Sequence, residues 1–198
     1  MRLALFLTLF RMVLSPLFIA LYLYYPQIGI SMNHLPYYLL FLLVICELTD
    51  IFDGQAARKF GGVTELGKIL DPMADSIVRT SILITFTQGV IQLPVLLILV
   101  FIYRDSMIST LRTLCALKGT VLAARPSGKI KAVIQAIVIF LIVILMIPYS
   151  KGLISLSLLQ QISFISVLLA AIYTVASGVE YVISNREAIK KSWVKQKS

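Results

Sequence analysis

The sequence predicts an all-α integral membrane protein with six transmembrane helices and with both termini in the cytoplasm. Its 198 residues are 59% hydrophobic and have a mean hydropathy of +0.94, whereas about half of the residues of a soluble domain are apolar. A helix needs roughly 20 apolar residues to cross the hydrocarbon core of a bilayer. Six segments approach or exceed that length, at residues 3–25, 35–54, 72–86, 91–117, 130–148 and 153–184.

Prolines and glycines separate the six segments, because both residues interrupt helices. The interruptions are, in chain order, Pro26 with residues 33–36, Gly61 with Gly62, Gly89 with Pro94, Pro126 with Gly128, and Pro148 with Gly152. We expect the first segment to be mature sequence, because Arg11 and Pro16 interrupt it and no small-residue cleavage site follows. The connections are short and no repeat or polar linker divides the chain, so we expect one domain over residues 1–198.

The basic residues predict the orientation of the segments. With the N-terminus inside, all of the 18 Lys and Arg residues except Lys151 fall on the inner side, as the positive-inside rule requires. We expect the inner membrane of a bacterium, with the active site facing the cytoplasm. Inner-leaflet anionic lipid attracts each juxtamembrane cation by about 1 kcal/mol, which accounts for the formal charge of +9 without a nucleic-acid partner. The basic C-terminal tail around Trp193 is expected on the membrane surface, without a catalytic role.

Four aspartates at the cytoplasmic edge of the second and third segments predict a metal site. Asp50 and Asp53 are three residues apart and Asp71 and Asp75 are four apart, so on helices each pair projects from one face. Carboxylates at the edge of apolar helices are costly to desolvate unless they share a cation. Residues 50–75 contain no His or Cys, and hard oxygen ligands favour Mg²⁺, Mn²⁺ or Ca²⁺ together with substrate phosphates. We expect two divalent cations, Mg²⁺ or Mn²⁺, in a clamp with a spacing of about 3.5 to 4 Å.

The segment between the aspartate pairs is suited to a nucleotide. Gly54, Ala57 and Gly67 lack bulk, which lets a ligand approach the backbone closely. The alternative is that the aspartates are helix caps and ion-pair partners of nearby basic residues such as Arg58 and Lys59 at a solvated interface. The clustering of four carboxylates in one part of a membrane chain favours the metal site.

The pattern of residues 50–75 resembles the signature of the CDP-alcohol phosphotransferase family, D-x2-D-G-x2-A-R-x8-G-x3-D-x3-D, at every fixed position. The six-segment layout is also similar to that family. The resemblance implies that the four aspartates bind two metal ions that hold the diphosphate of a CDP-linked lipid. It implies that Asp75 is the base that takes the proton of the acceptor hydroxyl, that CMP leaves, and that the protein is a homodimer. It also implies a cytidine and phosphate site lined by Gly54, Ala57, Arg58 and Gly67.

A second group of charged residues, around the end of the fourth segment and the start of the fifth, predicts a site for an acceptor phosphate. Asp105, Ser109 and Arg112 fall at i, i+4 and i+7, a helical stripe that we expect to face the bundle interior. Arginine supplies bidentate phosphate contacts and lysine a point charge. The expected anion pocket consists of Arg104, Arg112, Arg125, Lys129 and Lys131. The alternative is that the last three are ordinary positive-inside residues and that Arg104 and Asp105 form a structural pair.

This region resembles the branch of the family that forms phosphatidylglycerophosphate, which carries R-E, L-R and G-K-x-K-T at similar places. Thr8 and Arg11, followed by Pro16, resemble the T-x-x-R and proline of its first helix, which assigns Thr8 to the nucleotide and diphosphate site. The chain departs from the branch at Asp105, where the branch has Glu, and at Ala132 and Leu5, where it often has Thr and Asn. The resemblance implies transfer from CDP-diacylglycerol to glycerol 3-phosphate, with inositol phosphate, serine and phosphatidylglycerol as alternative acceptors.

Two other classes of membrane protein fit the sequence less well. An ion or phosphate transporter also places charges inside a helical bundle. However, the sequence has no inverted repeat, and both charged groups lie toward the predicted cytoplasmic side. A structural membrane subunit leaves the four aspartates unexplained. Small residues in the last segment, such as Ala170 and Gly178, permit close packing within the bundle or against a second subunit.

Overall fold

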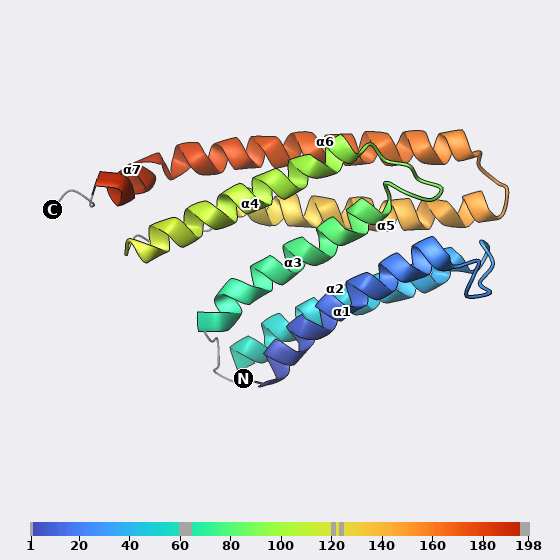
Figure 1. Ribbon diagram of the computed structural model, residues 1–198, viewed down its shortest axis with the longest axis horizontal. Coiled ribbons are helices and arrows are strands. Elements are labelled where there is room, and N and C mark those ends of the chain that lie inside the picture. Colours follow the sequence, from blue (N-terminus) through green and yellow to red (C-terminus); the bar gives the residue numbers. More distant parts are fainter. Residues whose placement is uncertain (1, 60–64, 120–121, 123–124, 195–198) are drawn as a thin grey trace. The chain divides into compact units, whose positions relative to one another are not determined.

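The computed structural model describes residues 2–59, 65–119, 122 and 125–194, and it describes side chains at residues 6, 9–49, 73–119, 122 and 125–190. Over this part of the chain it contains seven α-helices and no strand (Figure 1). The helices are α1 (Arg2–Tyr24), α2 (Leu35–Lys59), α3 (Glu65–Thr85), α4 (Val95–Leu117), α5 (Pro126–Ser150), α6 (Leu156–Ser184) and α7 (Arg186–Val194). The predicted all-α class is confirmed.

Each of the six predicted segments overlaps one helix, but several boundaries differ. The third was predicted to begin at Pro72, whereas α3 begins at Glu65 and continues through that proline. The prediction followed the apolar residues and therefore missed the polar first turns of α3. α5 begins at Pro126 rather than at residue 130, because proline suits the first helical position, where its missing N–H has no helical partner to lose. α4 begins only after Pro94, which is extended with φ −61° and ψ 126°.

The chain forms two compact units, and each is described by itself. The first contains Met1–Leu93 and Ile139–Phe164, and the second contains Pro94–Val138 and Ile165–Ser198. Helices α5 and α6 each contribute one part to the first unit and the other part to the second. The aspartate motif therefore belongs to the first unit, and the basic residues of the predicted acceptor pocket belong to the second.

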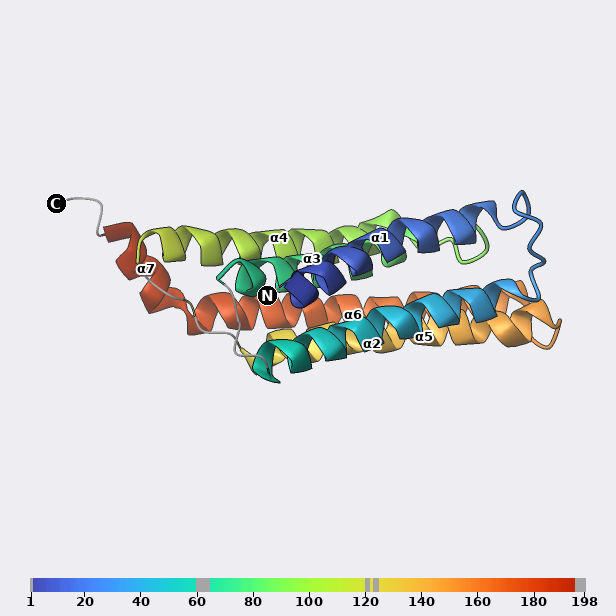
Figure 2. The same cartoon turned by 90° about the horizontal axis from the view of Figure 1, so that it is seen from below.

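In the first unit, α1 packs against both α2 and α3, as Figures 1 and 2 show. Tyr22 of α1 fixes the connection that follows α3. Its hydroxyl donates to the carbonyl of Gln88 at 3.1 Å and accepts the N–H of Ile91 at 3.3 Å, while its ring packs edge-on against Phe86. Gly89, with φ +66°, lies so close that an added Cβ would be 2.8 Å from the Tyr22 ring. Glycine is required at this position by both its backbone conformation and its contact.

In the second unit, α4 packs against α7. Ile108 and Cys115 of α4 form a buried cluster with Leu122 and with Tyr181 of α6. Asn185 joins α6 to α7, because its side chain donates to the carbonyl of Tyr181 at 2.8 Å and its own carbonyl accepts the N–H of the first turn of α7. The basic tail that was predicted to lie on the membrane surface is thus helical over most of its length, and its place on that surface stays a prediction.

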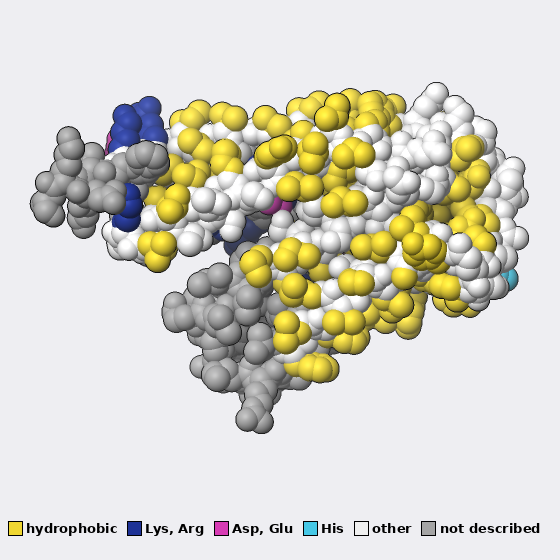
Figure 3. All heavy atoms as spheres, in the orientation of Figure 1, with side chains coloured by type: hydrophobic (Ala, Val, Ile, Leu, Met, Phe, Trp, Pro, Cys, Tyr) yellow, Lys and Arg dark blue, Asp and Glu magenta, His cyan; other side chains and the backbone are white. Residues whose placement is uncertain are grey.

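The described helices have the apolar character of a membrane protein. By length and composition, α5 and α6 are long and apolar enough to cross a membrane, and shorter apolar stretches run over Leu9–Tyr24 and Leu35–Thr49. Figure 3 shows hydrophobic side chains along the sides of the helices and Lys and Arg gathered near α7, where Arg186 and Lys190 are exposed. Exposed apolar surface of this extent is typical of a protein that contacts lipid.

Candidate active site

The four predicted metal ligands lie on two helices of the first unit. Asp50 and Asp53 lie on α2, and Asp71 and Asp75 lie on α3, and α1 packs against both helices. Only the side chain of Asp75 is described. The side chains of the other three aspartates lie outside the described part. The same holds for the residues of the predicted nucleotide site, which are Thr8, Gly54, Ala57, Arg58 and Gly67. The metal and nucleotide sites therefore stay predictions.

Asp75 is paired with a buried arginine of α1. The Nη1 of Arg11 donates to Oδ1 of Asp75 at 2.6 Å, and the two side chains are 5% and 24% exposed. A second guanidinium, that of Arg79 one turn later on α3, has its Nη1 3.9 Å from Oδ2 of Asp75. A buried charge requires a partner, so Arg11 and Asp75 stabilise one another and the ion pair orients the carboxylate. Asp75 is thus a positioned, partly exposed carboxylate, as a general base must be.

The donor set of the motif fits divalent metal ions. Among the described side chains, no three His, Cys, Asp or Glu residues lie together in a group that would hold a metal, and three of the four motif aspartates are outside that part. Residues 50–75 offer carboxylate oxygens and contain neither His nor Cys. Hard oxygen donors of this kind suit Mg²⁺ and Mn²⁺ better than zinc.

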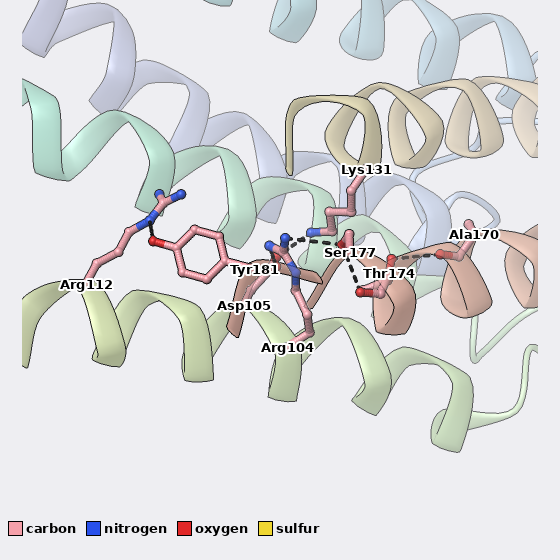
Figure 4. Close-up of polar contacts among 8 residues, drawn as sticks. All are labelled: Arg104, Asp105, Arg112, Lys131, Ala170, Thr174, Ser177 and Tyr181. Carbon is pink, nitrogen blue, oxygen red and sulfur yellow. Dashed lines mark hydrogen bonds and ion pairs between the residues drawn. The ribbon is translucent and has the colours of Figure 1, made fainter. Parts of the chain in front are cut away.

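In the second unit, Arg104, Asp105 and Lys131 form what we call the ion triad (Figure 4). The Nη1 of Arg104 donates to Oδ1 of Asp105 at 3.0 Å, and the Nζ of Lys131 donates to Oδ2 at 2.6 Å. The three side chains are only 12%, 14% and 6% exposed. The Nη2 of Arg104 also donates to the hydroxyl of Ser177 on α6 at 3.3 Å. The structural pair of Arg104 and Asp105, which the sequence left open as an alternative, is therefore present, and Lys131 shares its carboxylate.

Arg112 is held by an aromatic residue instead of a carboxylate. Its Nε donates to the hydroxyl oxygen of Tyr181 at 3.0 Å, and its guanidinium carbon lies 5.1 Å from the centre of the tyrosine ring. That distance is within the range of cation–π attraction, about 6 Å. Figure 4 shows Arg112 reaching from α4 to Tyr181 on α6.

The predicted inward stripe on α4 is correct for two of its three residues. Asp105 and Arg112 are partly buried, whereas Ser109 is exposed. A helix turns about 100° per residue, which places Ser109 about 40° to one side of Asp105 and Arg112 about 20° to the other. Ser109 therefore lies at the edge of the stripe, and the expectation that it faces the interior was wrong.

The remaining two cations of the predicted pocket lie around the start of α5. The Nε of Arg125 is 4.0 Å from Oε1 of Glu180, a partly exposed pair. Glu180 also accepts hydrogen bonds from the hydroxyls of Ser127 and Ser184. Lys129 is exposed. The pocket as predicted thus contains cations in three environments: two in the ion triad, one on Tyr181, and two near the surface.

The sequence profile of the CDP-alcohol phosphatidyltransferase family matches residues 1–176 of the chain. The chain belongs to this family. The match extends over both the aspartate motif and the basic residues of α4 and α5, and it confirms the resemblance inferred from the motif. As a CDP-alcohol phosphatidyltransferase the protein is a transferase of phospholipid biosynthesis, and not a transporter or a structural subunit.

Relatives of the chain within the family are similar over most of their length. A CDP-diacylglycerol–glycerol-3-phosphate 3-phosphatidyltransferase of Bacillus subtilis is 34% identical over 155 residues, 76% of this chain and 75% of the relative. A protein of the same name from Rickettsia typhi is 29% identical over 178 residues, 89% of this chain and 92% of the relative. A probable phosphatidylglycerophosphate synthase of Mycobacterium tuberculosis is 34% identical over 182 residues, 91% of this chain and 80% of the relative.

The structure adds residues that the sequence did not bring into the site. The partner of Asp75 on its own helix, Arg79, was detectable from the i, i+4 spacing of opposite charges. The sequence carries no signal for three other residues, because each contacts its partner across 53 or more residues of sequence. They are Tyr181, Ser177 and Glu180. An apolar helix with scattered Ser, Tyr and Glu gives no sign of which of them faces a basic neighbour.

Proposed function

We propose that this CDP-alcohol phosphatidyltransferase transfers the phosphatidyl group of CDP-diacylglycerol to glycerol 3-phosphate, which yields phosphatidylglycerophosphate and CMP. The observation that carries the proposal is the similarity, over most of the chain, to two relatives named for this acceptor and one named for phosphatidylglycerophosphate. The half-buried guanidinium of Arg112, which has no carboxylate partner among the described residues, supports a phosphorylated acceptor.

On this proposal the aspartates of α2 and α3 serve the donor substrate. Asp50, Asp53, Asp71 and Asp75 would hold two divalent cations, Mg²⁺ or Mn²⁺, which when bound neutralise the charge of the diphosphate. Asp75, oriented by Arg11, accepts the proton of the acceptor hydroxyl as its oxygen attacks the lipid-bearing phosphorus. The bond from that phosphorus to the oxygen of CMP breaks, and CMP leaves. Because the acceptor oxygen attacks the phosphorus directly, no covalent enzyme intermediate forms. The small and basic residues of the motif, with Thr8, line the nucleotide site.

The cations of the second unit serve the acceptor. Arg112 presents a planar fork suited to bidentate contact with a phosphate. Arg125 and Lys129 add positive charge from the start of α5. The two cations and one carboxylate of the ion triad sum to one positive charge, which adds to the attraction for an anion.

We further propose six transmembrane helices with both termini in the cytoplasm, a location in a bacterial inner membrane and a homodimeric state. The helix ends support this orientation, because α2, α4 and α6 end, and α3 and α5 begin, beside most of the basic residues, whereas Lys151 follows the end of α5. Small residues of α6 such as Ala170 and Gly178 permit close helix packing within or between subunits.

The test is an acceptor screen with the purified protein in detergent, supplied with CDP-diacylglycerol and Mn²⁺ or Mg²⁺. We expect CMP release with glycerol 3-phosphate and none with serine, inositol phosphate or phosphatidylglycerol. Release that depends on one of those other acceptors would overturn the acceptor assignment. EDTA is expected to stop the reaction and added Mn²⁺ to restore it, and activity that survives EDTA would remove the metal from the proposal.

The role of Asp75 is tested by the substitution Asp75→Asn, which keeps the size of the side chain and removes its basicity. General base catalysis contributes roughly 10²- to 10⁴-fold, so we expect at least a hundredfold loss of the rate of CMP release. The control is Glu187→Gln, which makes the same chemical change in an exposed carboxylate of α7 to which we assign no role, and it should leave the rate unchanged. Full activity of the Asp75→Asn protein would exclude Asp75 as the base.

A further inference from the structure

We propose that Tyr181 is a positioning residue for the acceptor phosphate, which it places through Arg112. The inference rests on the proposed function, because it takes the phosphate to be that of glycerol 3-phosphate. No bond is made or broken by Tyr181 on this proposal. Its role is to fix the guanidinium before the acceptor arrives.

Tyr181 is a rigid support. Its side chain is 1% exposed and packs with Ile108, Cys115 and Leu122, with partly buried apolar residues of α4, α6 and α7 around them. A side chain packed on all sides keeps one rotamer, so the hydroxyl that emerges from this cluster has a fixed place. Its one hydrogen bond among the described residues is the bond it accepts from the Nε of Arg112 at 3.0 Å.

This contact determines which edge of Arg112 remains for a ligand. A guanidinium has five N–H donors, one on Nε and four on the two terminal nitrogens. The Nε donor is used by Tyr181, and the described residues provide no acceptor for the four others. The edge formed by the two terminal nitrogens makes paired hydrogen bonds with phosphate oxygens. Tyr181 thus binds the Nε of Arg112, a donor that a phosphate bound to the two terminal nitrogens does not use.

Three other buried or half-buried cations in the described structure lie beside carboxylates. Arg104 and Lys131 share Asp105 at 3.0 and 2.6 Å, and Arg79 lies 3.9 Å from Asp75. Arg112 has an aromatic ring and a neutral hydroxyl instead of a carboxylate. A partly buried charge without a counter-ion is costly, and the phosphate of the acceptor supplies the missing negative charge.

Removal of the hydroxyl in Tyr181→Phe keeps the buried ring and frees Arg112 to rotate. The charge of Arg112 remains, so attraction at long range is unchanged, whereas the fixed fork is lost. We expect the KM for glycerol 3-phosphate to rise roughly tenfold, the effect of one hydrogen bond to a charged group. The kcat and the KM for CDP-diacylglycerol should stay within about twofold, because Tyr181 touches neither the donor nor the reacting atoms on this proposal.

The decisive experiment is a double-mutant cycle with Arg112→Lys, which keeps the charge and removes the fork. If Tyr181 acts through Arg112, the double variant has the same KM for glycerol 3-phosphate as Arg112→Lys alone. If the two effects multiply, or if Tyr181→Phe leaves that KM unchanged or raises the KM of both substrates equally, the positioning role is refuted. Tyr22→Phe is the matched control, since it also removes the hydroxyl of a buried tyrosine, and it should leave the KM for the acceptor unchanged.

The acceptor that the wild-type protein uses separates this inference from the proposed function. If the wild type releases CMP with glycerol 3-phosphate but the cycle is additive, the inference alone fails. If the wild type requires inositol phosphate instead, the acceptor assignment fails and the same cycle is run with that phosphorylated acceptor, where the same tenfold rise supports Tyr181. If the wild type requires serine, which has no phosphate, both fail.

Discussion

Replacement of Asp105 with asparagine removes the carboxylate that Arg104 and Lys131 share in the ion triad. The asparagine keeps the shape of the side chain and its carbonyl oxygen still accepts a hydrogen bond, but two cations that are 12% and 6% exposed are left facing a neutral group. Both were within 3.0 Å of the carboxylate. The substitution is therefore expected to destabilise the second unit and not merely to alter the acceptor site.

The magnitude follows from the geometry of the triad. Two unit charges about 4 Å apart interact by about 4 kcal/mol at an effective dielectric constant of about 20, and Asp105 interacts in this way with two cations. Removal of one partner of a buried ion pair costs about 3 to 5 kcal/mol in practice, and we expect Asp105→Asn to fall in this range. Lys131→Met should cost less, because Asp105 then keeps Arg104 at 3.0 Å and methionine fills the space of the lysine stem.

The assay is reversible unfolding in mixed detergent micelles, with the free energy of unfolding compared among Asp105→Asn, Lys131→Met and the double variant. We expect Asp105→Asn to be the least stable, and the double variant to recover part of the loss because one of the two cations that lose the Asp105 carboxylate is gone. An Asp105→Asn protein as stable as the wild type, or more stable than Lys131→Met, would refute the view that the triad stabilises the fold.

Three further predictions concern stability, measured as the midpoint and free energy of unfolding in detergent. Arg11→Gln should cost about 3 kcal/mol, the low end for a broken buried pair, since Arg79 remains 3.9 Å from Asp75; an unchanged midpoint would contradict the pairing. Gly89→Ala should lower the free energy of unfolding by about 1 to 2 kcal/mol for its positive φ and by more for its clash with the Tyr22 ring. The control Gly29→Ala, at φ +79° in open space, should show only the backbone cost, so equal losses in the two variants would exclude the clash. Gly128→Ala should stabilise α5 by about 0.5 to 1 kcal/mol. Gly178→Ala should give no such gain, because its Cβ would lie 3.1 Å from Cγ of Arg104; an equal gain would show that Arg104 moves away without cost.

The secondary structure and the family were largely predictable from the sequence. Apolar segments separated by Pro and Gly located six of the seven helices in the described part of the chain, because helix interiors and breaks depend on residues near in sequence. The boundary at Pro72 was wrong, since α3 begins with polar residues that a search for apolar length passes over. The aspartate motif named the family, because its chemistry requires fixed spacings within residues 50–75 of one stretch of chain.

The partners of the charged residues were decided only by the tertiary structure. The sequence placed Arg104, Arg112 and Lys131 in one group of cations, because their charge and helical spacing are all that it displays. Packing separates them: two share the carboxylate of Asp105, and the third rests on Tyr181, which is 69 residues away in the chain. Composition and local spacing thus determined a helical, apolar chain that carries the motif of a phosphatidyltransferase. Which cation lies beside a carboxylate and which lies beside a tyrosine depends on contacts between α4, α5 and α6 within the second unit, and local sequence does not encode these contacts.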